Sequence, residues 1–330
     1  MRVWKKSPWL LRHAIYALKI FFSGGNNDII YSLSALNGAI PSWLSARFFK
    51  KPFYLRIVGD YAWQAAAEKG KTDLLIDEFQ KNRKPFWINF IYNLQAGLAK
   101  RADLVIVPSE YLKKLVIGWR VKPEKIKVIY NAVSLKPLDI SKEEARTKIG
   151  IHGNIILSVG RLAPWKGFKM LIKIMPQLLN ISQFFRLVIV GDGPDKKNLK
   201  MMVENLGLAK KVYIAGRKSQ EELKIYFAAA DIFVLNSGYE GFSHQILEAM
   251  ACGAPVIASA VMGNREIIHQ GENGFMTKYN DEFNLIEAIK TLHQDDELKE
   301  KFISEGKKTV EFFSVEKMIE EMRKVLRSNT

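Results

Sequence analysis

The 330-residue sequence predicts an α/β protein with two doubly wound domains. Three observations predict this fold class. Short apolar segments rich in Val and Ile recur along the chain and mostly end in Gly or Ser, as buried parallel strands do. Segments between them repeat apolar residues every three or four positions, as amphipathic helices do. The length suffices for two domains, and a hydrophobic content of 48% can fill their cores.

The strand candidates are spread over both halves of the chain. In the second half they lie at 154–160, 186–191, 211–216, 231–237 and 254–259, and in the first half at 28–35, 51–59, 102–109 and 126–133. The stretch 134–150 has no strand pattern and is rich in Ser, Lys, Pro and charged residues, as linkers are. We therefore predict domains over 1–140 and 141–315, with a last helix over 316–330 that returns toward the first domain.

Charge is distributed unevenly along the chain. Residues 1–150 contain 26 Lys and Arg against 12 Asp and Glu, a net charge of +14, whereas the rest of the chain carries only +2. Such asymmetry suggests an anionic partner for the first half: a membrane surface, an acidic acceptor or nucleic acid. General solubility is the alternative. The single cysteine, Cys252, cannot form an internal disulfide, which favours a reducing compartment.

The first 22 residues predict an amphipathic helix with an apolar and a basic stripe. The stripes consist of Trp4, Leu11, Ile15, Leu18 and Phe22, and of Lys5, Arg12 and Lys19. Such a helix can lie in a membrane interface or pack on a sheet, and both alternatives stay open. No apolar run reaches the length of a spanning helix and no signal-peptide cleavage site follows, so we expect a cytoplasmic protein that contacts the inner face of the cell membrane peripherally.

The stretch YEGFSHQILEAMACGAPVIAS predicts a ligand site after a strand. Glu240 lies in the loop, Ser243 suits the N-cap of the following helix, and Gly253 suits its left-handed end. Free N–H groups at the helix start can bind phosphate, and Glu248 lies two turns further on. Carboxylates beside a phosphate need hydrogen-bond donors, such as sugar hydroxyls. This favours a nucleotide sugar, although from spacing alone both glutamates are equally well explained as solvated charges.

Further candidates follow the other strands. Arg161 and Lys166 lie in a loop that Gly160 and Gly167 allow to turn, and two cations at a strand end can neutralise a diphosphate. Three more glycines and one asparagine occupy equivalent loops: Gly191, Gly193, Gly263 and Asn264. All of these loops are expected at one edge of the sheet, where ligands of such folds bind.

In this arrangement the chain resembles the family 4 glycosyltransferases, the retaining glycosyl transferases group 1, whose GT-B fold has two facing Rossmann-like domains. The matching segments are SVGRLAPWKG, VIVGDGP, VYIAG, DIFVLNSGYEGFSHQILEAMACGAPVIAS and GNREIIHQGENGF, in order across 154–276. The first half matches more weakly, through ADLVIVPSEYLKK and KIKVIYNAV.

The resemblance implies a role for each matched residue. Arg161 and Lys166 would hold the donor diphosphate, Glu240 would contact the transferred sugar, and Glu248 would hold the ribose hydroxyls. The other donor-binding residues implied are Gly160, Gly191, Gly216, Arg217, Gly241, Phe242, Ser243, Gly263 and Asn264. Of these, Gly216 and Arg217 lie where the family holds the base.

The implied activity is transfer of a sugar from a nucleotide diphosphate sugar to a glycan, lipid-linked or other hydroxyl acceptor, with retention, in cell-envelope polysaccharide or glycolipid synthesis. No cofactor and no metal are expected, because the two cations can do a metal's work and no Asp-x-Asp or His cluster is evident. Nucleic acid is not an expected partner. The alternatives are a truncated, non-catalytic remnant or accessory subunit, and a nucleotide-sugar epimerase or phosphorylase.

Two departures from the family pattern concern the first half. The chain opens at a later helix, so roughly one βα unit is expected to be absent from its start. The histidine that many members carry after a strand of the first domain has no equivalent, and Asp60 stands near that place. Asp60 is therefore a candidate acceptor-side base, or alternatively a turn residue.

Overall fold

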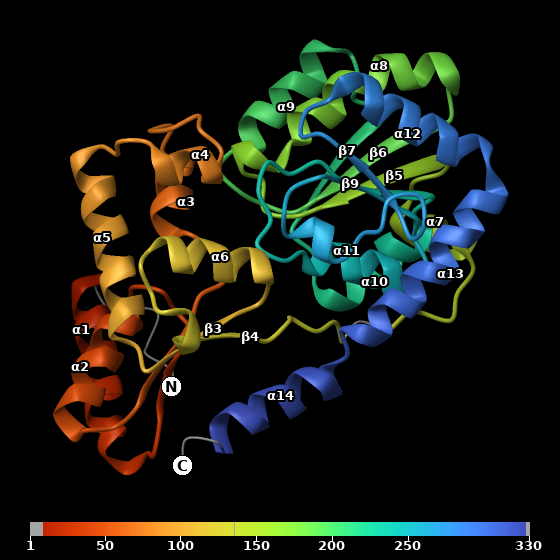
Figure 1. Ribbon diagram of the computed structural model, residues 1–330. Coiled ribbons are helices and arrows are strands. Elements are labelled where there is room, and N and C mark those ends of the chain that lie inside the picture. Colours follow the sequence, from red (N-terminus) through yellow and green to blue (C-terminus); the bar gives the residue numbers. More distant parts are fainter. Residues whose placement is uncertain (1–8, 135, 328–330) are drawn as a thin grey trace. The chain divides into compact units, whose positions relative to one another are not determined.

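A computed structural model describes residues 9–134 and 136–327 and divides the chain into two units (Figure 1). Unit 1 comprises Met1–Tyr130 with Glu321–Thr330, and unit 2 comprises Asn131–Glu320. Unit 2 begins ten residues before the predicted boundary because Val133 already belongs to it: its N–H donates to the Phe313 carbonyl at 3.2 Å. Within the part of the chain that the structure describes, no helix combines the length and hydropathy needed to cross a bilayer.

Unit 2 contains a six-stranded parallel sheet in the order β10-β9-β8-β5-β6-β7. Its strands are β5 (Asn154–Val159), β6 (Phe185–Val190), β7 (Val212–Gly216), β8 (Ile232–Leu235), β9 (Val256–Ser259) and β10 (Phe275–Thr277). The five strands predicted here are confirmed. The sequence did not predict β10, which has only three residues and hence too little pattern to recognise.

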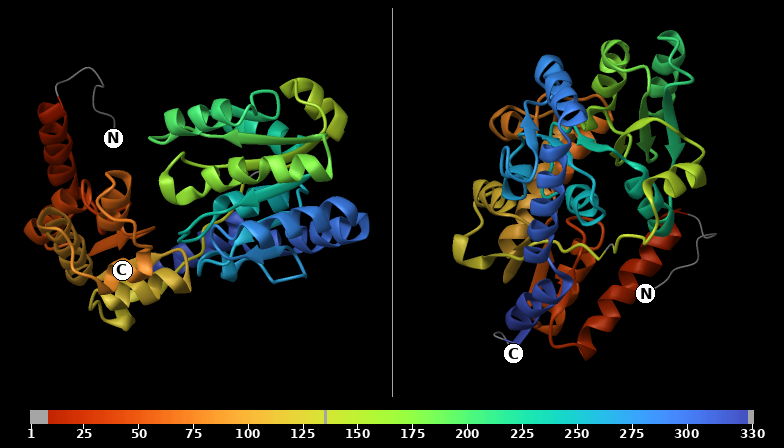
Figure 2. Two further views of the ribbon diagram at one scale, coloured as in Figure 1. Left: turned by 90° about the horizontal axis from the view of Figure 1, so that it is seen from above. Right: turned by 90° about the vertical axis from the view of Figure 1, so that its right-hand side faces the viewer.

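Helices cover both faces of this sheet (Figures 1 and 2). They are α7 (Lys142–Ile149), α8 (Phe168–Ile181), α9 (Lys196–Asn205), α10 (Gln220–Ala229), α11 (His244–Ala251), α12 (Glu282–Gln294) and α13 (Asp296–Phe312). The last helix, α14 (Val315–Arg327), does not cover the sheet, and from Glu321 onward it belongs to unit 1. Alternate side chains of β5 enter opposite cores: Ile155 and Leu157 pack with α7, α10 and α11, whereas Ile156 packs with α8, α9 and α12. Burial on both faces explains why these strands are apolar throughout.

Unit 1 repeats the architecture with four parallel strands in the order β1-β2-β3-β4. The strands are β1 (Ile30–Ser32), β2 (Phe53–Arg56), β3 (Leu104–Val107) and β4 (Ile126–Val128). The helices are α1 (Trp9–Ser23), α2 (Ala39–Phe49), α3 (Tyr61–Glu68), α4 (Ile76–Lys81), α5 (Phe86–Arg101) and α6 (Glu110–Gly118). Two Rossmann-like α/β domains are therefore confirmed. That a βα unit is absent before α1 stays a prediction.

The opening helix packs on α2 with a face other than the predicted one. Phe21 lies against Phe48 and Phe49, with ring centroids 5.2 and 5.7 Å apart. Leu18 and Phe22, which belong to the predicted apolar stripe, are 55% and 67% exposed. The helix is thus held by one face and leaves part of its stripe uncovered.

Four residues of the two predicted stripes cannot be followed in the structure. Trp4 and Lys5 lie outside the described residues, and so do the side chains of Leu11 and Arg12.

Candidate active site

The strand order of unit 2 creates a crevice between β5 and β8. After β5 the chain adds β6 and β7 on one side of the sheet, and β8, β9 and β10 follow on the other. The loops that leave β5 and β8 therefore diverge at their carboxyl ends, the place where open α/β sheets bind ligands. These two loops carry the predicted cations and the first predicted glutamate.

Lys166 and Glu240 meet in this crevice although 74 residues separate them. The Lys166 Nζ donates to Glu240 Oε1 at 2.6 Å, and only 13% and 9% of the two side chains are exposed. A buried ion pair is stabilising only when its geometry is good, and removing one partner leaves an uncompensated charge. The two side chains therefore depend on each other, and the alternative that Glu240 is a solvated loop charge is wrong.

The turn that carries Lys166 is fixed from behind by two asparagines. Gly167 has φ of +66°, and a Cβ there would come 1.8 Å from the Asn236 carbonyl oxygen. Asn236, which is 1% exposed, donates from Nδ2 to the Gly167 carbonyl at 3.4 Å and to Asn280 Oδ1 at 3.0 Å. In return its Oδ1 accepts from the Asn280 N–H at 3.1 Å. Neither asparagine was predicted from the sequence, although Asn236, a polar residue directly after a buried strand, offered a usable signal.

The loop after β9 supports Glu240 through backbone contact. A Cβ on Gly263 would lie 2.2 Å from the Glu240 carbonyl oxygen, so only glycine permits this approach. Asn264 is fully buried and its Nδ2 donates to the Ser259 carbonyl at 2.9 Å, so its side chain braces the loop instead of facing outward. A single 3₁₀ turn, Asn264–Glu266, follows in this loop and leads toward β10.

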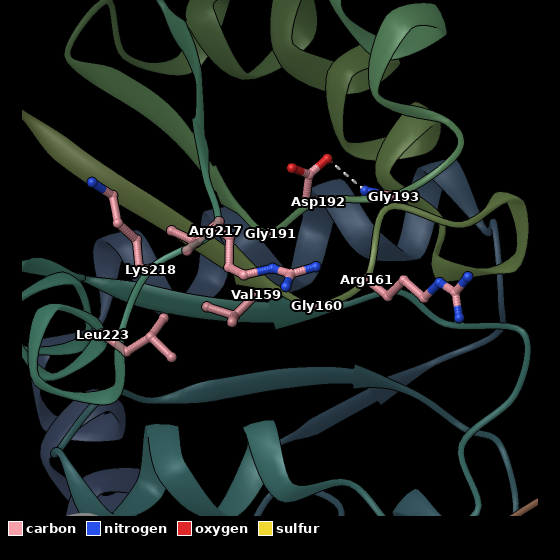
Figure 3. Close-up of a pocket in the computed structure, with 10 residues that line it drawn as sticks. Val159, Gly160, Arg161, Gly191, Asp192, Gly193, Arg217, Lys218 and Leu223 are labelled. Atoms are coloured by element: carbon pink, nitrogen blue, oxygen red, sulfur yellow. Dashed lines mark hydrogen bonds between the residues drawn. The ribbon is translucent and has the colours of Figure 1, made fainter. Parts of the chain in front are cut away.

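A pocket of about 550 Å³ opens beside the crevice at the ends of β5, β6 and β7 (Figure 3). It is lined by Val159, Gly160, Arg161, Val190, Gly191, Asp192, Gly193, Arg217, Lys218 and Leu223. The backbones of two loops touch at its floor, because a Cβ on Gly191 would lie 1.8 Å from the Gly160 carbonyl oxygen. The structure therefore brings five predicted residues of three loops around one cavity, namely Gly160, Arg161, Gly191, Gly193 and Arg217.

Cations dominate the walls of this pocket. Arg161, Arg217 and Lys218 contribute three positive charges, and Figure 3 shows the Arg217 side chain reaching toward Gly160 and Gly191. The one carboxylate in the lining, Asp192, accepts a hydrogen bond from the Gly193 N–H at 2.9 Å and lies 3.3 Å from Lys196, and these contacts lower its pKa. A surplus of positive charge suits an anionic ligand. Asp192 and Lys218 were not predicted from the sequence.

Helix α11 begins and ends as predicted. The Ser243 hydroxyl caps it by accepting from the Ile246 N–H at 3.4 Å, and Gly253 beyond its last turn has φ of +76°. The Phe242 ring turns away from the surface and packs on Phe313, with centroids 5.2 Å apart. The backbone of 241–243 is thereby held at the helix start, where N–H groups favour anions.

Glu248 is the second predicted carboxylate, and burial in α11 raises its pKa to about 7. No hydrogen bond or ion pair joins its side chain to any other residue that the structure describes. A half-protonated carboxyl without a partner is ready to accept hydrogen bonds from a ligand. The same burial raises the pKa of the neighbouring Cys252 thiol to about 12.

Replacing Glu248 with Gln should stabilise the protein at alkaline pH. The pKa is about 7 in the folded chain, against 4.5 for an ordinary glutamate carboxyl, so folding disfavours the ionised form. This cost is absent below pH 4.5, grows as the pH rises from 4.5 to 7, and reaches about 3 kcal/mol above pH 7. Thermal unfolding of Glu248→Gln should therefore show a higher Tm than the parent at pH 8 and an equal Tm at pH 4. Equal Tm values at both pH values would contradict a buried carboxyl.

Asp60 occupies a structural position in unit 1. It is fully buried at the N-cap of α3, where its Oδ1 accepts from the Trp63 N–H at 3.0 Å. Gln95 and Gln80 each donate to its carboxylate at 2.7 Å. With these donors bound, neither carboxylate oxygen of Asp60 is exposed to an acceptor substrate. The structure therefore favours a turn residue over an acceptor-side base.

Across residues 9–134 and 136–327, no group of three or more His, Cys, Asp and Glu side chains is placed to hold a metal ion. The expectation of a metal-independent site stays a prediction.

Models of known families match nearly the whole chain. A model described as "Glycosyl transferases group 1" matches residues 140–309, and one described as "Glycosyltransferase Family 4" matches residues 5–136. The first covers more than half of the chain, and its match spans every loop of the crevice and the pocket.

Curated relatives and solved structures point the same way. The chain is 28% identical to the N-acetylgalactosamine-N,N'-diacetylbacillosaminyl-diphospho-undecaprenol 4-alpha-N-acetylgalactosaminyltransferase of Campylobacter jejuni, over 84% of this chain and 74% of that protein. It is 29% identical to the lipopolysaccharide core biosynthesis glycosyltransferase LpsE of Rhizobium meliloti, over 66% of this chain and 62% of that one.

Among solved structures, Anabaena HepE in complex with UDP-glucose superposes with a TM-score of 0.82 at 24% identity, covering 99% of this chain and 85% of that one. The sucrose-phosphate synthase of Thermosynechococcus elongatus gives a TM-score of 0.80 at 22% identity, over 99% of this chain and 80% of that one. At these identities the likeness concerns the fold. Fold and family models together place this chain in the glycosyl transferases group 1 family of GT-B glycosyltransferases.

Proposed function

We propose that this glycosyltransferase takes a sugar from a nucleotide diphosphate sugar and transfers it, with retention of anomeric configuration, to a hydroxyl of a glycan or lipid-linked acceptor. The observation that carries the proposal is the buried pair of Lys166 and Glu240 at the switch point of the sheet. A cation and a carboxylate held 2.6 Å apart match the two adjacent parts of such a donor, its diphosphate and its sugar.

The diphosphate lies between Lys166 and Arg161 in this proposal. Both cations leave the same loop, and the N-terminus of α11 adds N–H groups that favour anions. As the bond to the sugar breaks, negative charge grows on the leaving diphosphate, and fixed cations stabilise it without reorganisation. They do the work of a metal ion, so turnover should persist in the presence of a chelator.

Entry of the donor exchanges one ion pair for two sets of contacts. Lys166 Nζ, which donates to Glu240 Oε1, turns to phosphate oxygens, and the freed Glu240 carboxylate accepts hydrogen bonds from sugar hydroxyls. Neither charge is left buried without a partner during the exchange. Glu240 then lies close to the positive character that develops on the sugar and stabilises it electrostatically.

The nucleoside end of the donor occupies the 550 Å³ pocket. The base lies against Arg217, which lines the pocket, and against the adjacent Gly216 at the end of β7. The ribose hydroxyls donate to Glu248, which is not among the lining residues but belongs to α11. A neutral carboxyl accepts hydrogen bonds less strongly than a carboxylate does. Because the pKa of Glu248 is about 7, we expect the KM for the donor to fall as the pH rises through 7.

The acceptor side of the proposal concerns the cell envelope. The Campylobacter relative is named for an undecaprenol-linked substrate and the Rhizobium relative for lipopolysaccharide core biosynthesis. By analogy we assign this chain to polysaccharide or glycolipid synthesis in the cytoplasm, at the inner face of the membrane. The net charge of +14 over residues 1–150 supports a partner with negative charge.

Release of free nucleoside diphosphate tests the proposal. A panel of nucleotide sugars is first screened for binding by thermal shift, and each donor that binds is incubated with and without lipid-linked and oligosaccharide acceptors. Diphosphate release that depends on an acceptor is the expected result. Release or epimerised sugar without any acceptor would overturn the proposal in favour of an epimerase, and binding without turnover would indicate an accessory subunit.

A further inference from the structure

The first turn of α5 exposes three aromatic side chains to solvent. Phe86, Trp87 and Phe90 are 77%, 71% and 55% exposed. Their rings touch edge to face, with centroids 5.5 Å apart for Phe86 and Trp87 and 6.3 Å for Trp87 and Phe90. These three residues, the aromatic tip, form one apolar patch at the helix end that follows α4 (Figure 1).

The aromatic tip takes no part in the core of unit 1. Helix α5 buries its opposite face through Ile88, Gln95, Ala96, Leu98 and Ala99. A helix of a soluble domain normally turns polar side chains to the other face, whereas α5 turns Phe and Trp outward in its first turn. Large contiguous apolar patches mark interaction sites.

The segment before the tip is rigid. The Lys84 ammonium lies over the rings of Phe79 and Tyr92, 4.8 and 4.4 Å from their centroids, and donates to the Gln80 and Asn82 carbonyls at 3.3 and 3.1 Å. Pro85 then forms the N-cap, with φ of −53°. The aromatic tip is thus presented on a fixed turn, so inserting it into a partner costs little conformational entropy.

Basic residues directly precede the tip. Lys81, Arg83 and Lys84 stand within five residues before Phe86, and the nearest acidic residues in the sequence, Asp77 and Glu78, lie further back in α4. Lys81 and Arg83 are exposed, and no ion pair joins either of them to another residue that the structure describes. Basic side chains beside Trp and Phe are the composition that binds the headgroup region of anionic membranes.

We propose that the aromatic tip is a membrane anchor, which inserts Phe86, Trp87 and Phe90 at the headgroup boundary of a bilayer containing anionic lipid. Lys81 and Arg83 contact the lipid phosphates beside it. This inference rests on the proposed function in one respect: an enzyme with a lipid-linked acceptor works at a bilayer. The proposal places the anchor on α5 and not on the opening helix.

Vesicle sedimentation tests the anchor on the full chain. Vesicles of phosphatidylcholine with about 30 mole per cent phosphatidylglycerol imitate an anionic membrane leaflet. They are compared with vesicles of pure phosphatidylcholine. Phe86→Ser/Trp87→Ser/Phe90→Ser should lower the partition coefficient for anionic vesicles at least about tenfold, because three interfacial aromatic side chains are lost. Lys81→Gln/Arg83→Gln should lower it severalfold and weaken its dependence on salt.

Two control variants make the test specific. Phe184→Ser/Phe283→Ser removes aromatic side chains of unit 2 that are 68% and 73% exposed, and should bind vesicles like the parent. Leu18→Ser/Leu44→Ser alters α1 and α2, at side chains 55% and 47% exposed. Loss of binding in that variant with normal binding of the triple variant would overturn the proposal.

Further measurements distinguish membrane binding from catalytic activity. The triple variant should keep the parent's Tm and its nucleotide-sugar binding, because none of the three side chains is buried. Vesicle binding by a chain that shows no sugar transfer would leave the anchor standing and remove the proposed function. Concentration-dependent dimerisation that the triple variant abolishes, together with no vesicle binding by the parent, would show that the tip binds a second copy and would overturn the anchor.

Discussion

Replacing Lys166 with Met should lower kcat/KM for sugar transfer by about a thousandfold. Lys166 is only 13% exposed and aims its ammonium into the crevice, where it neutralises the leaving diphosphate in the proposed mechanism. Losing one preorganised charge at a developing anion costs about 10²–10³-fold in rate. Initial rates of acceptor-dependent diphosphate release measure the effect. Turnover at the parental rate would remove Lys166 from the site.

The stability of the same variant separates a structural defect from a catalytic one. Lys166→Met leaves the Glu240 carboxylate buried without its cation, which should destabilise the protein by about 3–5 kcal/mol. Lys166→Met/Glu240→Gln removes both charges at similar volume, so its Tm should return to near the parental value while its activity stays lost. Recovery of activity along with stability would contradict the proposed chemistry.

A neighbouring lysine provides the matched control. Lys173 lies seven residues along in α8, is 57% exposed and pairs with Glu282, which is 30% exposed, at 2.5 Å. Lys173→Ala should change both activity and Tm only slightly, since exposed ion pairs contribute about 0–1 kcal/mol.

Replacing Gly167 with Ala should destabilise the protein and abolish transfer. The new Cβ would fall 1.8 Å from the Asn236 carbonyl oxygen, inside the distance that any carbon can occupy, and the backbone stays in the left-handed region at φ of +66°. The turn must then move, and Lys166, the preceding residue, moves with it away from Glu240. We expect a loss of at least about 3 kcal/mol, from overpacking together with left-handed strain.

Gly207 isolates the two causes. Its φ is also +66°, but no atom lies within 4 Å of the position of its Cβ. Gly207→Ala should therefore show the left-handed penalty alone, about 1–2 kcal/mol, and keep full activity. Calorimetry gives the two Tm values and initial rates give the activities. A Tm for Gly167→Ala equal to that of Gly207→Ala would contradict the close packing of the turn on β8.

Local patterns were enough to place the strands and the loops of unit 2. Apolar runs ending in Gly or Ser marked five of its six strands, and the carboxyl ends of parallel strands must share an edge. Ser243 and Gly253 marked the ends of α11 because each residue type satisfies a definite backbone requirement at a helix terminus.

The same patterns gave weaker information on side chains whose surroundings come from distant segments. Asp60 looked like a polar residue after a strand, but Gln80 and Gln95, 20 and 35 residues away, enclose its carboxylate. Asn280 had no signal at all, because its partner Asn236 lies 44 residues earlier in the chain. Neither the contacts of Asp60 nor those of Asn280 can be deduced from the residues next to them in the sequence.

The sequence by itself determined the α/β class, the edge of the sheet that carries the site, and the residue types available there. Only the tertiary structure decided that Lys166 and Glu240 form a buried pair, that Glu248 is desolvated enough to titrate near pH 7, and that Phe86 and Trp87 stay outside the core. The physical reason is that the period of a strand or helix depends on local backbone geometry, whereas burial, charge and exposure depend on which distant segments pack against a side chain.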